Sequence, residues 1–183
     1  APDPNADNVS VLVFSDLHER FDLLPDLLDV ADFKKHGFVV FNGDTFFEVH
    51  SAYQVERFLR TVSKQFAAEV PFVFVRGNHD ATGAFARHLP DYVGFTEGAP
   101  FTAFFRMGPA ALAFLDTGDE PSDKSADYRE LMGFDGWRAY QTDMLEPVVR
   151  STPWTSAPFR IVVSHMGMGD DWRSMFENSG LDL

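Results

Sequence analysis

Short apolar runs recur along the chain and alternate with segments of helical spacing, a pattern that is typical of an α/β fold. The runs are rich in Val, Ile and Phe and nearly continuous, as expected of strands that are buried on both faces of a sheet. They are Val9–Phe14, Phe38–Phe41, Val70–Val75, Ala110–Leu115 and Phe159–Val163. The first three runs and the intervals between them predict a β-α-β-α-β unit with a parallel sheet.

Both of these intervals predict amphipathic helices. In the first, Asp22 is the expected N-cap, Pro25 lies in the first turn and Gly37 is the expected stop. The second, residues 51–69, carries a single apolar stripe at helical spacing. The stripe consists of Val55, Phe58, Leu59, Val62 and Phe66.

The second half of the chain predicts a hairpin and a further helix. Residues 101–117 have the pattern of two strands joined at Met107–Pro109. A helix is expected at Trp137–Val149, limited at its end by Pro147, and the polar stretch Pro121–Phe134 is expected to be an exposed loop. The side chains expected to face inward from this helix are Tyr140, Met144 and Val148.

The composition excludes several classes of function. A chain of 183 residues fits one domain, which we assign to residues 9–183 after a disordered leader at 1–8. The net charge of −13 argues against a nucleic-acid or anionic-membrane footprint, because such surfaces need a basic face. No apolar run approaches the roughly 18–20 residues that cross a bilayer. The absence of Cys excludes disulfides, zinc–thiolate sites and thiol catalysis.

Side chains that bind metals or catalyse reactions directly follow most of the apolar runs. They are Asp16 and His18 in SDLH, Asp44 in NGDT, Asn78, His79 and Asp80 in GNHD, and His165 in VVSH. Because sites in open α/β sheets form outside the carboxyl ends of the strands, we expect these side chains to meet at one rim. Asp16 and His18 strengthen this expectation, since alternate residues of an extended segment project the same way.

Each of these residues alone also has a structural interpretation. Asp16 and Asp44 could cap the helices that follow them, and Asn42-Gly43 is a common turn signal. A lone His165 at a strand end could be a structural histidine. The coincidence of ligand-type residues at several strand ends favours a metal site over these separate explanations.

Other ligand-type residues are left out of the predicted site. His36, His50 and His88 lie near expected helix ends and follow no strand. Asp116 follows the Ala110–Leu115 run without a recognisable partner in the sequence. We interpret Asp116 either as a structural residue or as a support of the site.

The order of these motifs resembles that of the calcineurin-like metallophosphoesterases. The matching blocks are Asp16-Leu17-His18, Gly43-Asp44, Gly77-Asn78-His79-Asp80 and Ser164-His165, four of the family's five. The resemblance implies a four-layer α/β/β/α sandwich that holds two metal ions. It also implies hydrolysis of phosphate mono- or diesters, with a small phosphoester as the substrate.

Carried over to this chain, the resemblance implies a specific set of metal ligands. Asp16 and His18 would hold the first ion, Asp44 would bridge both ions, and Asn78 and His165 would hold the second. A carboxylate can bridge two cations whereas a neutral imidazole cannot, so Asp44 is a suitable residue for the shared position. Nitrogen and oxygen ligands without thiolate suit Mn, Fe, Zn or Co.

The resemblance also implies catalytic roles. A hydroxide bridging the two ions would attack the phosphorus, while the ions clamp the phosphoryl oxygens. His79 would act on the leaving-group oxygen and Asp80 would orient and polarise His79. Asn78 and His79 would contact the substrate.

The chain departs from the family pattern in three places. Phe47 occupies the position of the tyrosine ligand of purple acid phosphatases, so no tyrosinate colour or ferric preference is expected. Met166 follows His165 where the family often has His or Pro. The last family block, G-H-x-H, is absent, and the ending MFENSGLDL resembles the segment that leads into it. We therefore expect a fragment of a longer protein, with an exposed edge on its second sheet, rather than a degenerate member.

Two other classes of function are alternatives for this sequence. A catalytically inactive binding module would have no use for both His79 and Asp80, so their presence favours an enzyme over such a module. An inactive fragment of an enzyme stays open as the other alternative. A nucleotide-binding α/β protein is excluded because neither G-x-x-x-x-G-K-[ST] nor G-x-G-x-x-G follows the first run. The start APDPNADN favours a protein exported to the periplasm or medium after signal-peptide removal, the alternative being a cytoplasmic protein.

Overall fold

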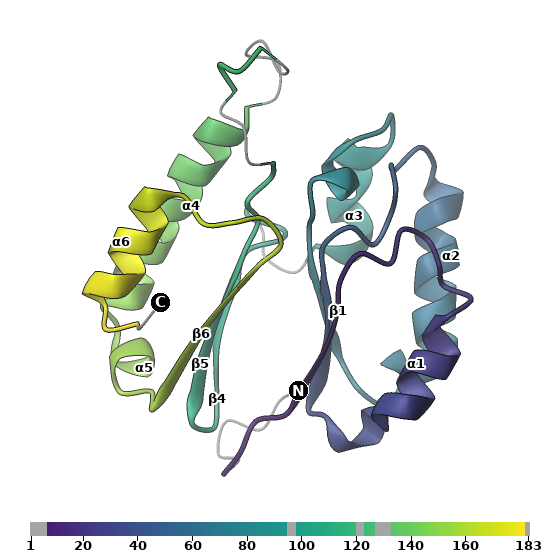
Figure 1. Ribbon diagram of the computed structural model, residues 1–183, viewed down its shortest axis with the longest axis horizontal. Coiled ribbons are helices and arrows are strands. Elements are labelled where there is room, and N and C mark those ends of the chain that lie inside the picture. The colour runs from purple at the N-terminus through teal and green to yellow at the C-terminus, as the bar shows by residue number, and fades with distance from the viewer. Residues whose placement is uncertain (1–6, 95–97, 120–122, 127–132, 182–183) are drawn as a thin grey trace.

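The computed structural model describes residues 7–94, 98–119, 123–126 and 133–181, which contain two three-stranded sheets packed face to face (Figure 1). The strands are β1 Val11–Phe14, β2 Phe38–Asn42, β3 Phe72–Val75, β4 Ala103–Met107, β5 Ala110–Leu115 and β6 Phe159–Ser164. The first sheet has the order β1-β2-β3 and is entirely parallel. In the second, β5 pairs with β4 antiparallel and with β6 parallel. The predicted parallel unit and hairpin are confirmed.

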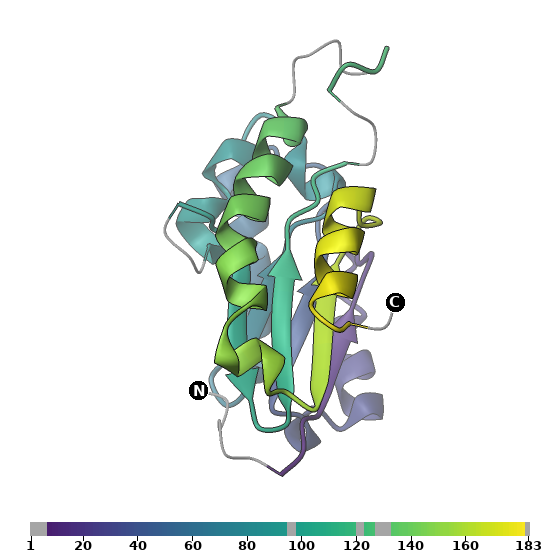
Figure 2. The ribbon, with the colours of Figure 1, turned by 90° about the vertical axis from the view of Figure 1, so that its left-hand side faces the viewer.

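Helices cover the outer faces of both sheets. They are α1 Leu24–Ala31, α2 Ala52–Val62, α3 Pro90–Val93, α4 Phe134–Val149, α5 Thr152–Thr155 and α6 Asp170–Asn178. Helices α1 and α2 lie against the first sheet, and α4 and α6 run side by side over the second (Figure 2). The expected α/β/β/α sandwich is therefore present. No helix in the described ranges is long and apolar enough to cross a membrane.

Hydrophobic clusters fill the spaces between the layers. Phe41 and Phe58 pack edge to face between the first sheet and its helices, with ring centroids 5.0 Å apart. Phe38 and Phe114 pack against each other between the two sheets. Burying such rings is the main source of stability in a domain of this size, and it fixes how the layers are stacked.

Only the central strands are buried along their length. β2 and β5 are almost entirely buried, whereas β1, β3 and β6 are partly exposed. On β6, Phe159 is 62% and Ile161 is 40% exposed. The prediction of burial on both faces is wrong for the outer strands, because each of them has one neighbouring strand among the described residues.

The predicted ends of the first helix are also wrong. Leu23 is the N-cap of α1 and makes no side-chain cap, while the Asp22 carboxylate accepts hydrogen bonds from Arg20. Asp32 ends the helix in a left-handed conformation with φ of 51°. Gly37 lies further on, where its N–H donates to the carbonyl of Ser10 and begins the pairing of β1 with β2. The predicted leader falls mostly on residues 1–6, outside the described ranges.

The buried face of α4 differs from the predicted one. It carries Phe134, Gln141, Leu145 and Val149 rather than Tyr140, Met144 and Val148. The reason is Gln141, whose side-chain amide bonds both the N–H and the carbonyl of Asp116 in the interior. The spacing of apolar residues does not predict a buried polar residue such as Gln141. The stretch predicted as a loop lies partly outside the described residues, and its last residue, Phe134, is buried at the start of α4.

An ion pair joins the two sheets at the ends of β3 and β5. An Nη of Arg76 lies 2.7 Å from Asp116 Oδ2, and its Nε donates to Oδ1 at 3.1 Å. The Asp116 carboxylate is fully buried and also accepts a hydrogen bond from the indole N–H of Trp137 at 2.9 Å. Of the two interpretations of Asp116, the structure assigns it to this contact between the sheets.

Asp116→Ala is expected to lower the free energy of unfolding by about 3–5 kcal/mol, because it leaves a largely buried guanidinium and an indole N–H without their acceptor. Equilibrium unfolding in urea measures this. Glu146→Ala is the matched control, since it breaks the exposed pair with Arg150, and it should change stability by less than about 1 kcal/mol. Equal effects of the two substitutions would contradict the bridging role of Asp116.

Candidate metal centre

The loops after β1 and β2 are held together by backbone hydrogen bonds that continue the pairing of the two strands. The N–H groups of Asp16 and His18 donate to the carbonyls of Gly43 and Asp44 at 3.1 and 2.9 Å. The next bond runs from the N–H of Glu19 to Thr45 at 2.9 Å. These bonds fix the positions of two predicted ligands relative to a third.

Asp16, His18 and Asp44 form a cluster in which their ligand atoms lie within 4.8 Å of one another. His18 Nε2 is 3.9 Å from both Asp16 Oδ1 and Asp44 Oδ2. All three residues have positive φ, at 58°, 43° and 50°. Non-glycine residues rarely adopt this conformation, which costs about 1–3 kcal/mol per residue. Residues strained in this way cluster at functional sites.

His165 reaches the same carboxylate from the second sheet. Its Nε2 lies 3.2 Å from Asp44 Oδ2, and its Nδ1 bonds the carbonyl of Asn42 at 2.9 Å. Because a carbonyl only accepts, Nδ1 donates the hydrogen of this bond, and a neutral ring would present the lone pair of Nε2 to the carboxylate. Two facing acceptors repel each other unless a cation or proton lies with them. This arrangement fits a metal ion.

The two oxygens of the buried Asp44 carboxylate have different partners. Oδ2 faces both His18 and His165, whereas Oδ1 accepts a hydrogen bond from the N–H of His79 at 3.0 Å. The capping interpretation of Asp44 is excluded, because the helix that follows, α2, begins with a capping box formed by Ser51 and Gln54. The capping interpretation of Asp16 fails likewise, since α1 has no side-chain cap.

Two glycines allow the loops to come this close. A Cβ on Gly43 would lie 2.2 Å from the ring of His165, and the residue also has φ of 78°. A Cβ on Gly77 would lie 2.2 Å from Asp44 Oδ1. Both contacts are shorter than real Cβ contacts, so any side chain at either position would displace a predicted ligand.

His79 lies beside the cluster, and its ring is held by a backbone carbonyl. Nδ1 donates to the carbonyl of Phe47 at 2.8 Å, and the ring centroid lies 5.0 Å from that of His18. The other ring nitrogen, Nε2, is not used in this bond. Asn78 lies next to His79 and is partly buried, and its roles as a ligand and a substrate contact stay predictions.

The role of Asp80 in orienting and polarising His79 stays a prediction. The Asp80 carboxylate accepts hydrogen bonds from the backbone N–H groups of Phe46 and Gly77 at 2.8 and 2.9 Å. His79 and Asp80 begin a short 3₁₀-helix, in which adjacent side chains point in different directions. Asp80 therefore joins the loop after β2 to the loop after β3.

Burial raises the pKa of Asp80 to about 7, even though the N–H donors of Gly77 and Phe46 lower it. The nearby charge of Asp44 raises it further. Such a group is held in place by its bonds to the backbone and has no exposure to solvent. It is suited to anchoring two loops rather than to exchanging protons with a substrate.

Asn42 is a site residue that the sequence did not reveal. Its carbonyl accepts the bond from His165, and its side-chain amide donates to the carbonyl of Ser164 at 3.2 Å. Asn42 thus connects β2 directly to the end of β6. The sequence predicts only that Asn42 belongs to a turn. Its position at the end of the central strand is the one feature that could have identified it as a site residue.

The remaining histidines lie in other surroundings. His36 contacts Ser10, His50 pairs with Glu48, and His88 lies near Asp91. In the described ranges, the cluster of Asp16, His18 and Asp44 is the one group of carboxylates and imidazoles close enough to hold an ion together.

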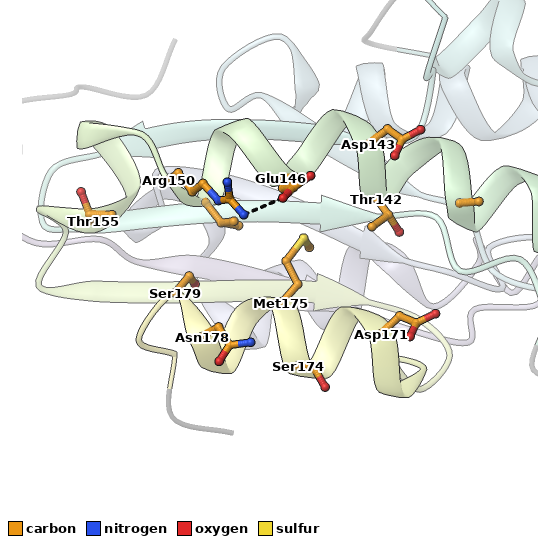
Figure 3. A pocket seen from close by; sticks show the side chains of 12 residues that line it. Thr142, Asp143, Glu146, Arg150, Thr155, Asp171, Ser174, Met175, Asn178 and Ser179 are labelled. Carbon is orange, nitrogen blue, oxygen red and sulfur yellow. Dashed lines mark hydrogen bonds and ion pairs between the residues drawn. The ribbon is translucent and has the colours of Figure 1, made fainter.

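A groove of about 860 Å³ lies between α4 and α6, away from this cluster (Figure 3). Its walls include Thr142, Asp143, Met175 and Asn178, with the Glu146–Arg150 ion pair on one side. None of the predicted ligands lines this groove. The size of a cavity therefore does not identify the metal centre in this chain.

A family model described as calcineurin-like phosphoesterase matches residues 9–183. No curated protein matches the sequence. The matched range includes every predicted metal ligand.

Gly77→Ala is expected to weaken Mn²⁺ binding at least tenfold, because the added Cβ would push the Asp44 carboxylate out of place. Equilibrium dialysis followed by elemental analysis measures bound metal. Gly136→Ala on α4 is the control, since a Cβ there meets no atom within 4 Å, and it should bind Mn²⁺ like the unaltered chain. Undiminished binding by a folded Gly77→Ala variant would contradict the close approach of Gly77 and Asp44.

Proposed function

The chain belongs to the calcineurin-like phosphoesterase family, and from this premise we propose that it hydrolyses phosphate mono- or diesters with two divalent metal ions. One observation carries the proposal. The single oxygen Asp44 Oδ2 faces an imidazole nitrogen from each sheet, His18 Nε2 at 3.9 Å and His165 Nε2 at 3.2 Å. A carboxylate oxygen shared between two imidazole nitrogens is an arrangement that suits a pair of ions.

The cluster of Asp16, His18 and Asp44 fits one ion, and His165 beside Asp44 supports a second. Asp16 and His18 would hold one, His165 and Asn78 the other, and Asp44 would contact both. Two ions held there would lower the pKa of a water nucleophile and neutralise charge on the phosphoryl oxygens. The nitrogen and oxygen donors suit Mn, Fe, Zn or Co.

The charge of the chain supports a metal-dependent mechanism. Asp16 and Asp44 would repel a phosphate ester from the cluster, and the net charge of −13 adds to this repulsion. Cations bound between these carboxylates reverse the local field. Substrate binding should therefore depend on metal, and removal of metal by a chelator should abolish it.

The geometry of His79 supports a role for it at the leaving group. The bond from Nδ1 to the carbonyl of Phe47 fixes the orientation of the ring. In the imidazolium form Nε2 carries a second proton, which it can give to the leaving-group oxygen as the ester bond breaks. The N–H of His79 bonds Asp44 Oδ1, so the backbone of the proposed acid is attached to the proposed bridging ligand.

Metal content and activity test the proposal together. The purified chain is loaded with Mn²⁺, its bound metal is measured, and release of 4-nitrophenol from 4-nitrophenyl phosphate and its bis ester is followed. Two ions per chain with chelator-sensitive hydrolysis would support the proposal. Bound metal without hydrolysis of either ester would instead assign a metal-binding module.

Asp44→Ala is expected to remove at least one ion per chain and nearly all activity, because the variant lacks the carboxylate that both imidazoles face. Elemental analysis after Mn²⁺ loading gives the stoichiometry. A variant that still held two ions would refute the bridging role.

His79→Ala is expected to lower turnover by roughly 10²–10⁴-fold with metal content unchanged, as for loss of a general acid. Steady-state kinetics and elemental analysis of the same sample separate the two effects. His88→Ala removes a histidine outside the cluster and should retain full turnover. Unchanged turnover in His79→Ala would remove this residue from the mechanism.

A further inference from the structure

Phe47 presents an exposed aromatic ring at the mouth of the metal centre. Its side chain is 58% exposed, although the Phe residue before it in the sequence is fully buried. Its ring centroid lies 5.1 Å from that of His79 and 5.8 Å from that of His18. The exposed ring therefore borders both the proposed general acid and a proposed metal ligand.

The outward position of this ring is fixed by its own backbone. The N–H of Phe46 donates to the carboxylate of Asp80 at 2.8 Å, and the carbonyl of Phe47 accepts from His79 at 2.8 Å. These bonds attach the segment on both sides of the Phe47 side chain to the GNHD loop. Phe46 then points into the hydrophobic core, and Phe47 points to the site.

Exposure alone would mean little, because single apolar side chains are common on protein surfaces. Phe159 is similarly exposed, at 62%, but it lies on the outer strand β6 and is not among the ring contacts of the site. Phe47 differs in touching the imidazole that would meet the leaving-group oxygen. A planar group attached to that oxygen would come to lie beside the Phe47 ring.

We propose that Phe47 is a platform for an aromatic leaving group, so that the site prefers phosphate esters of aryl alcohols over those of alkyl alcohols. This inference rests on the proposed function. Aromatic rings stack with an offset or edge to face, and the exposed ring of Phe47 contacts the rings of both His18 and His79. The aromatic group should be bonded directly to the leaving oxygen, because Phe47 contacts the proposed acid itself.

Binding of non-hydrolysable analogues tests this without relying on turnover. Benzylphosphonate and ethylphosphonate carry a methylene in place of the ester oxygen and differ in the aromatic ring. Isothermal titration of the Mn²⁺-loaded chain should show that benzylphosphonate binds about tenfold more tightly, in line with one aromatic contact. Phe47→Ala should remove this preference and leave ethylphosphonate binding unchanged. Phe159→Ala, the matched control, should keep the preference.

Several outcomes would overturn the platform. They are equal binding of the two phosphonates by the unaltered chain, no binding of either, a preference that survives in Phe47→Ala, and an equal loss for both ligands in that variant. The last of these would mean that the ring only supports His79.

Kinetics with phenyl phosphate and ethyl phosphate separates this inference from the proposed function. If Phe47→Ala lowers kcat/KM for both esters by the same factor, the platform fails while the proposed function stands. A Phe47-dependent preference in phosphonate binding, with no hydrolysis of either ester, overturns the proposed function and leaves an aromatic binding site.

Discussion

The parallel pairing of β2 with β1 on one side and β3 on the other is the constraint on which the metal centre depends. It brings the carboxyl ends of three consecutive strands to one edge, with the loop of Asp44 between the other two. Backbone bonds from the loop after β1 and from the N–H of His79 then converge on Gly43 and Asp44. Position in the sheet, rather than side-chain packing, makes Asp44 the centre of the cluster.

This close convergence has a conformational cost that the fold offsets locally. Asp16, His18 and Asp44 all adopt positive φ, which an isolated loop would avoid. The bonds that continue the β1–β2 ladder hold the first two in this conformation, and the small size of Gly43 and Gly77 leaves room for the third. The close pairing of the loops after β1 and β2 therefore accounts both for the positive φ angles and for the short distances between the ligand atoms.

Much of this arrangement could be predicted from the sequence, and the failures share a cause. The strands and the residues following them carry strong local signals, so Asp16, His18, Asp44 and His165 could be identified as neighbours. The partner of Asp80, the role of Asn42 and the buried face of α4 could not. Each of these depends on a polar group that bonds backbone atoms distant in the sequence, and such bonds leave no periodicity or motif.

In the proposed centre, the second ion would depend on the second sheet. The first sheet alone supplies Asp16, His18 and Asp44, which are enough for one cation. His165 joins them because Asn42 bonds it across the interface, and because Gly43 leaves space for its ring. Any change in the packing of the two sheets would therefore move His165 relative to Asp44 while leaving the first three ligands in place. The proposed second ion could therefore bind only when both sheets are assembled.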